Sequence, residues 1–178
     1  MRELPTLTTP RLSLRPFRLS DAARVQSLAG KHEVADTTLS LPHPYLDGMA
    51  EGWIATHEGE WTRHEGVTLA VTEPDEGLVG AITLRIELAH RRAELGYWVG
   101  LPFWGRGYAT EAAAAMVRFG FETLGVSRIY AHHFMRNPAS GRVMEKVGMR
   151  REGVLPAHFW RWGVPEDVAV WGMLAPRG

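Results

Sequence analysis

The stretch from Trp98 to Thr123, WVGLPFWGRGYATEAAAAMVRFGFET, constrains the fold more than any other part of the chain. It indicates an apolar strand, a loop with two glycines, and a helix rich in alanine, a strong helix former. Gly105 and Gly107 let the backbone bend tightly and bring its N–H groups close to a ligand. The first N–H groups of the helix lack internal partners and carry part of the helix dipole. Loop and helix start together predict an anion site that suits a phosphate or pyrophosphate.

Two common phosphate-binding loops fit this stretch poorly. A P-loop has a lysine after its glycines, and no lysine follows them here. A dinucleotide-binding loop has Gly or Ala where this chain has Thr110, and an acidic residue at the end of the next strand. That strand ends here in Phe134 and Met135. A turn that only packs a strand against a helix is the structural alternative.

Composition favours one globular domain and excludes several kinds of chemistry. The 178 residues suffice for a substantial core, and 20 basic residues balance 20 acidic ones. A net charge of zero gives no overall field for nucleic acid or an anionic membrane. The absence of cysteine excludes disulfides, thiolate metal ligands and a cysteine nucleophile. No signal-peptide core is visible and no apolar run approaches about 18 residues, so we expect a cytoplasmic protein.

Hydrophobic periodicity predicts seven strands and about four helices in a single α+β domain, residues 1–178. The expected helices cover residues 20–30, 49–61, 109–124 and 137–147, and the short links between residues 67 and 99 indicate an antiparallel meander. The expected strands are Arg11–Arg15, Val67–Thr72, Leu78–Ile86, Ala93–Val99, Arg128–Phe134, Val154–Arg161 and Asp167–Leu174, with the last hairpin turning around Gly163-Val164-Pro165.

Three blocks of sequence resemble the GNAT acyltransferases and, within them, the RimJ/RimL-type branch. The first is AELGYWV at residues 93–99. The second is WGRGYATEA, which matches the acetyl-CoA loop Q/R-x-x-G-x-G/A except that Trp104 replaces the usual Gln or Arg. The third is Asn137–Ser140 with Glu145–Met149, close to the family's N-x-x-S…EK-x-G-F. The resemblance covers nearly the whole chain and implies a mostly antiparallel sheet whose parallel central strands splay apart to admit CoA.

The resemblance also implies an acetyl-CoA-dependent N-acetyltransferase, which moves an acetyl group from the thioester to a primary amine. The strand near Trp98 and Val99 would pair with the pantetheine amides. Asn137 would bind the pantetheine arm, and it also suits the N-cap of the following helix. The loop that would hold the pyrophosphate by its N–H groups consists of Trp104, Gly105, Arg106, Gly107, Tyr108, Ala109 and Thr110.

Attack of an amine on a thioester needs a neutral amine, a stabilised oxyanion and a proton for the leaving thiolate. Glu94 is our candidate base, because a carboxylate in this part of the central strand often serves as base in the superfamily. An ion pair with Arg85 or Arg92 is the structural alternative. Ser140 is our candidate donor to the thiolate, and a first-turn serine that bonds the backbone is its alternative. An apolar residue stands where many family members carry a tyrosine acid.

The eight histidines show no metal-site spacing, and we expect no metal. His132 and His133 are neighbours on a strand and must face opposite sides. One of them is a candidate secondary base that lines the CoA gap.

A protein N-terminus is the acceptor that we expect. A peptide α-amine, with a pKa of about 7.7–8.0, tolerates a weak base, whereas a lysine at about 10.4 needs a stronger one. The alternatives are a small amine (an aminoglycoside, a polyamine or an amino acid derivative), a non-catalytic acyl-CoA-binding regulatory domain, and a nucleotide-binding oxidoreductase. Residues 32–61 would form the acceptor cleft, and relatives that are often dimers leave a homodimer open.

Overall fold

The computed structural model describes residues 3–176, so the ends of the predicted domain, residues 1–2 and 177–178, lie outside the described residues. This part of the chain contains one eight-stranded sheet, in the order β1-β2-β3-β4-β5-β6-β8-β7. The strands are β1 (Leu7–Thr8), β2 (Ser13–Arg15), β3 (Gly66–Glu73), β4 (Gly77–Glu87), β5 (Arg92–Val99), β6 (Arg128–Phe134), β7 (Arg150–Arg161) and β8 (Val164–Leu174). The helices are α1 (Ala22–Ala29), α2 (His32–Asp36), α3 (Met49–Thr62), α4 (Tyr108–Glu122) and α5 (Pro138–Lys146).

The predicted α+β domain with a mostly antiparallel sheet is confirmed, with two elements more than expected. The described residues hold eight strands rather than seven because Leu7–Thr8 pair with Leu14 and Ser13. Two residues are too few to show an alternating pattern. The five-residue helix α2 likewise escaped prediction, because its single turn shows no periodicity.

The turn of the last hairpin was placed wrongly. Trp162 and Gly163 form it, with φ of 48° and 80°, while Val164 and Pro165 already pair with β7. Positive φ at both central residues is the geometry of a two-residue hairpin turn whose twist matches that of the strands. Gly163 supplied the signal for a turn, but the pattern placed it one residue too late.

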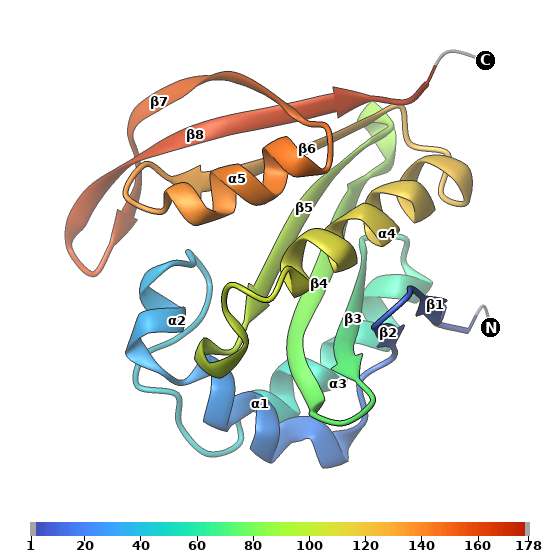
Figure 1. Cartoon of the computed structure of the whole chain (residues 1–178), viewed down its shortest axis with the longest axis vertical. Helices are drawn as coiled ribbons and strands as arrows, with labels where there is room; N and C mark the ends of the chain where they lie inside the picture. The colour runs from blue at the N-terminus through green and yellow to red at the C-terminus, as the bar shows by residue number, and fades with distance from the viewer. Residues whose placement is uncertain (1–2, 177–178) are drawn as a thin grey trace.

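Helices cover both faces of the sheet, as Figure 1 shows. α4 crosses β4 and β5 on one face, and α5 lies beside α4 against β6. α1 and α3 pack against each other and against β4 and β3 on the opposite face. No helix among residues 3–176 has the length and apolar character needed to cross a membrane.

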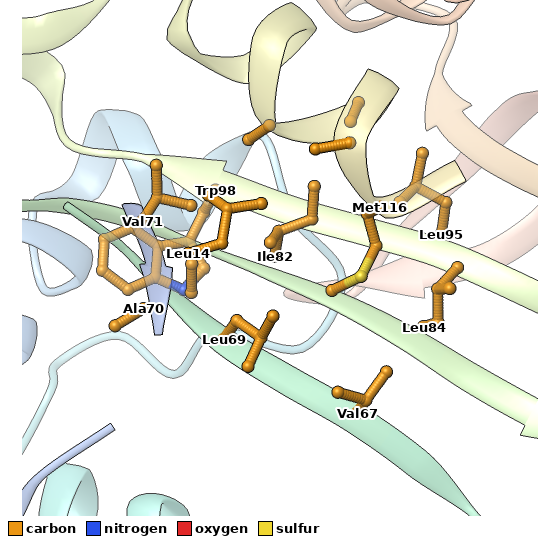
Figure 2. Close-up of a cluster of buried hydrophobic side chains, with 14 of the residues drawn as sticks. Leu14, Val67, Leu69, Ala70, Val71, Ile82, Leu84, Leu95, Trp98 and Met116 are labelled. Carbon is orange, nitrogen blue, oxygen red and sulfur yellow. The ribbon is translucent and has the colours of Figure 1, made fainter. Parts of the chain in front are cut away.

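The core between α4 and the sheet fixes the position of the glycine loop that precedes α4. Figure 2 shows Met116 of α4 extending between Ile82 and Leu84, with Leu95 nearby, and all four side chains are buried. Each such side chain contributes about 1.5–3 kcal/mol when fully buried. Gly120 lets the helix lie close, because a Cβ there would come within 2.7 Å of Ile129 Cδ1. Tight packing of α4 therefore holds its N-terminus at a fixed place beside β5.

The central strands splay apart, as expected. β5 and β6 are parallel neighbours, but they pair only from Arg92 with Arg128 to Glu94 with Tyr130. β6 continues to Phe134 with β8 as its partner on the other side. Within the described sheet, the β6-facing edge of β5 beyond Glu94 has no strand partner, so its N–H and C=O groups before the Val99 carbonyl, which accepts from Trp104, are available to a ligand.

Candidate active site

Two cavities meet where β5 and β6 separate. The larger has a volume of about 750 Å³ and the smaller of about 300 Å³. A molecule in one cavity can reach a molecule in the other, because five residues line both. These shared residues are Thr37, Thr38, Tyr97, Trp98 and Ser140.

The smaller cavity contains the glycine loop. Gly105 and Gly107 both have positive φ, of 75° and 82°, and Gly107 is the N-cap of α4. The unpaired N–H groups of the first helical turn therefore stand at the wall of this cavity. Of the residues predicted to bind CoA, the structure brings ten together here: Trp98, Val99, Trp104, Gly105, Gly107, Tyr108, Ala109, Thr110, Asn137 and Ser140.

Arg106 is the exception among the predicted loop residues. Its guanidinium donates to Glu76 Oε1 at 2.9 Å, in the turn between β3 and β4, and it does not line either cavity. Trp104 also has a structural role, since its Nε1 donates to the Val99 carbonyl at 2.7 Å and ties the loop to the end of β5. The aromatic residue thus occupies the usual Gln or Arg position and still holds the loop in place.

Arg11 supports the loop from the N-terminal segment, which sequence reasoning missed. Its Nη1 donates to the Arg106 carbonyl at 3.0 Å, and its Nε donates to Glu111 Oε2 at 2.7 Å. The other carboxylate oxygen of Glu111 accepts from the Thr9 hydroxyl at 2.6 Å. A residue 95 positions away in sequence gives no local signal for such a contact.

Asn137 and Ser140 form a compact pair at the start of α5. Asn137 is the predicted N-cap, with its Oδ1 accepting from the Ser140 N–H at 3.4 Å and its Nδ2 donating to Ser140 Oγ at 3.0 Å. The Ser140 oxygen is thus occupied as an acceptor, which leaves its hydrogen free to donate. The first-turn role of Ser140 and its candidate role as a donor are compatible.

Arg142 and Lys146 are two further cations on the wall of the smaller cavity. They lie four residues apart on α5, so they project from the same face of the helix. Neither has a carboxylate partner within salt-bridge distance among residues 3–176. Helical spacing from Asn137 could have identified this pair from sequence.

Tyr97 stands at the junction of the two cavities and was also missed. Its hydroxyl lies 3.5 Å from the Ser140 carbonyl, in donor geometry. Burial raises the pKa of Tyr97 to about 12, so the phenol stays protonated at neutral pH. The sequence pattern placed Tyr97 in a strand but gave it no role in the site. A tyrosine in a strand offers no local signal that its side chain faces a gap between strands.

The larger cavity contains Glu94 together with Arg85 and His132. Glu94 Oε1 lies 3.2 Å from His132 Nδ1, and Glu94 Oε2 lies 3.7 Å from Arg85 Nη1. The hydrogen bond from His132 and the positive charge of Arg85 lower the pKa of Glu94 against the opposing effect of burial. Glu94, the predicted base, therefore contacts His132 and also forms the ion pair with Arg85 that was its structural alternative.

Segment 37–42 forms one wall of the larger cavity, within the region predicted to shape the acceptor cleft. Arg161 at the end of β7 holds this segment. Its guanidinium donates to the carbonyls of Ala35 at 2.8 Å, Leu39 at 3.0 Å and Leu41 at 2.6 Å, and it stacks on Trp162. The shape of this wall thus depends on a residue more than a hundred positions away.

His57 and His64, which are seven residues apart in the sequence, do not form a metal site. His57 is buried between Phe17 and Trp53, and burial lowers its pKa to about 4, while His64 is exposed. Among the described residues, no three His, Cys, Asp or Glu side chains come together as metal ligands would.

A family model described as an acetyltransferase (GNAT) domain matches residues 11–150. The chain belongs to the GNAT acetyltransferase family. The resemblance to GNAT enzymes is therefore confirmed, and the oxidoreductase alternative is excluded. The family uses acetyl-CoA as its acetyl donor.

Individual relatives are named as N-acetyltransferases, and one of them is named for spermidine. The chain is 33% identical over 175 residues to the N-acetyltransferase YoaA of Bacillus subtilis (strain 168), and the aligned part covers 97% of this chain and 98% of that protein. It is 24% identical over 159 residues to spermidine N(1)-acetyltransferase of Vibrio cholerae, covering 88% and 89% of the two chains. RimJ of Mycobacterium smegmatis, solved with CoA-disulfide, superposes with a TM-score of 0.83 at 25% identity, covering 97% of this chain and 87% of that one.

Proposed function

We propose that this N-acetyltransferase transfers the acetyl group of acetyl-CoA directly to a primary amine, and that the amine is the α-amine of a protein or peptide. The junction of the two cavities supports this proposal most directly. A pyrophosphate-type loop opens on one side of the splayed strands, and a carboxylate–histidine pair opens on the other. This arrangement allows donor and acceptor to approach from opposite sides.

On the donor side, the N–H groups at the start of α4 bind the pyrophosphate, and the free edge of β5 near Trp98 and Val99 pairs with the pantetheine amides. Asn137 has one amide hydrogen beyond its bond to Ser140, and this hydrogen reaches the pantetheine arm. Arg106 contributes only its backbone, because its side chain binds Glu76.

The reaction forms one bond and breaks another. The amine nitrogen attacks the thioester carbonyl carbon, the C–S bond breaks, and the proton that the nitrogen loses ends on the sulfur of the released CoA thiol. The negative charge of Glu94 drives the loss of the proton, and the free hydrogen of Ser140 stabilises the departing thiolate. Tyr97 adds a second protonated hydroxyl at the junction.

An α-amine fits the charge of the larger cavity better than a polyamine does. The carboxylates on its wall are Glu60 and Glu94, and Arg85 faces the second of these. A polycation would meet little negative charge in such a cavity. An amine with a pKa of about 8 is already partly neutral at neutral pH, so it needs less help from a base than an amine with a pKa of about 10.4. A volume of about 750 Å³ leaves room for several residues of a peptide.

Thiol release from acetyl-CoA, measured with a panel of amines, tests the proposal. We expect release with short peptides that have free N-termini, and none after the N-terminus is blocked. Release only with polyamines or aminoglycosides would replace the peptide by a small amine. Tight binding of acetyl-CoA in calorimetry without release from any amine would favour the non-catalytic alternative, and no binding at all would contradict the assignment of the loop.

Arg142 and Lys146 are expected to recognise the 3′-phosphate of CoA, because they are unpaired cations on the wall of the donor cavity. The double variant Arg142→Ala, Lys146→Ala should bind acetyl-CoA about tenfold more weakly, while its affinity for acetyl-dephospho-CoA should change little. Calorimetry of both ligands measures the ratio. Arg118→Ala, on the exposed side of α4, is the matched control for loss of positive charge. Equal weakening for both ligands would contradict recognition of the 3′-phosphate.

A further inference from the structure

His132 lies on the same side of the sheet as Glu94, and sequence alone left open whether His132 or His133 faces the reaction. Glu94 and Tyr130 are register partners across the parallel pair, and His132 follows Tyr130 by two residues. Side chains alternate along a strand, so His132 shares the face of Tyr130 and Glu94. His133 also borders the larger cavity, but its side chain leaves the other face of the strand and lies against Gly141, where an added Cβ would lie 2.8 Å from the imidazole Nε2.

The hydrogen bond to Glu94 fixes the tautomer of His132. An ionised carboxylate only accepts hydrogen bonds, so the contact of 3.2 Å requires a hydrogen on Nδ1. In the neutral ring the other nitrogen, Nε2, then carries a free lone pair. No protein group among the described residues donates to or accepts from this Nε2, and the ring stands in the wall of the larger cavity.

Neighbouring rings hold the imidazole in place. Its centroid lies 5.6 Å from that of Tyr130 and 6.1 Å from that of Phe159, both nearly perpendicular to it. His158 stacks at 6.3 Å on its outer side. Phe159 and His158 follow a break in the register of β7, where Ala157 has a φ of 47° and its N–H donates to Asp167. The break therefore directs two rings of β7 toward His132.

Glu94 is the less suitable of the two groups to take a proton. One of its oxygens accepts from His132, the other faces Arg85, and its pKa is lowered as a result. Both contacts stabilise the ionised carboxylate, which makes it a weaker base. The same ionised carboxylate stabilises a positive charge on the adjacent imidazole.

We propose that His132 Nε2 takes the proton of the attacking amine and that Glu94 is the positioning residue that orients and charges this imidazole. The inference rests on the proposed acetyl transfer. As the amine nitrogen bonds to the thioester carbon, its proton passes to Nε2, and the imidazolium pairs with the Glu94 carboxylate. The C–S bond breaks, and solvent water carries one proton from His132 to the thiolate. The net change is one proton moved from nitrogen to sulfur.

Several titratable or charged groups surround His132. Glu94 of β5 and Arg85 of β4 lie on one side, and His158 of β7 lies on the other. Tyr130, on the same strand, donates to Glu87 at 2.9 Å. The strand partner of His132 in β8 is Val170, which is uncharged.

The dependence of kcat on pH distinguishes His132 from Glu94 as the base. With saturating peptide and acetyl-CoA, His132→Gln should lower kcat at least about a hundredfold and abolish the rising inflection of the profile. Glu94→Gln should lower kcat about tenfold and keep the inflection, because the imidazole that takes the proton is still present. His90→Gln, an exposed histidine between β4 and β5, should match the wild type.

The opposite pattern, with the inflection kept in His132→Gln and lost in Glu94→Gln, would make Glu94 the base and overturn the proposal. Unchanged kcat in His132→Gln would also overturn it. Calorimetry with acetyl-CoA checks that both variants keep the donor site. NMR of labelled histidines provides a second test, since the Nδ1–H tautomer of His132 should be lost in Glu94→Gln. Failure of the wild type to turn over any amine would instead refute acetyl transfer itself.

Discussion

Gly107→Val is expected to weaken acetyl-CoA binding at least about tenfold. Gly107 has a φ of 82°, a conformation that costs a residue with a Cβ roughly 1–2 kcal/mol, and more for a β-branched one. An added Cβ would also lie 3.3 Å from Arg11 Nη2, which supports the loop. The backbone relieves this strain by turning the N–H groups of the first turn of α4 away from the cavity, and each 1.4 kcal/mol of lost interaction weakens binding tenfold.

Gly48→Val is the matched control for this experiment. Gly48 is also a helix N-cap, with a φ of 83°, and nothing lies within 4 Å of its added Cβ. Both variants should lose a similar amount of stability in thermal unfolding, but only Gly107→Val should lose affinity for acetyl-CoA in calorimetry. Equal loss of affinity in both would mean that general destabilisation, rather than the loop, accounts for the effect.

The sequence predicted a helix or strand correctly wherever the hydrophobic pattern extended over the whole element. β6 has the predicted bounds, Arg128–Phe134, because apolar and polar residues alternate along it and strong breaks flank it. The turn at Trp162 and Gly163 was misplaced because proline at position 165 was taken as a turn residue, although it lies in β8, opposite Trp160. Local signals compete there, and only the pairing of β7 with β8 decides between them.

The candidate site likewise has one part that the sequence predicted and another part that it did not. The loop around Gly107 was predictable because all its parts are contiguous, and Asn137 was found as a helix cap for the same reason. The contact of Glu94 with His132, and that of Arg161 with segment 37–42, join residues 38 and more than 100 positions apart. Such contacts depend on strand register and on where β5 and β6 separate, and neither property can be predicted from the local sequence.

Arg161→Ala is expected to destabilise the protein by about 3 kcal/mol and to raise the acceptor KM about tenfold. The side chain is 9% exposed and donates three hydrogen bonds to backbone carbonyls of residues 35–41. Removing a charged donor leaves those carbonyls without partners, at a cost of about 1–3 kcal/mol for each that stays buried. For a chain of this length, 3 kcal/mol corresponds to a fall in Tm of about 6–12 °C.

The effect on KM follows from the place of segment 37–42 rather than from stability. This segment lines the larger cavity, so its loss of order enlarges and loosens the acceptor site, while the glycine loop keeps its own support from Arg11. Arg161→Lys should recover only part of both effects, because an ammonium group cannot reach three carbonyls with fixed geometry. Arg63→Ala removes an exposed guanidinium paired with Glu65 and should change neither Tm nor KM. Thermal unfolding and acceptor kinetics at saturating acetyl-CoA measure both quantities. A fall in Tm with an unchanged acceptor KM would show that Arg161 stabilises the hairpin without shaping the acceptor cavity.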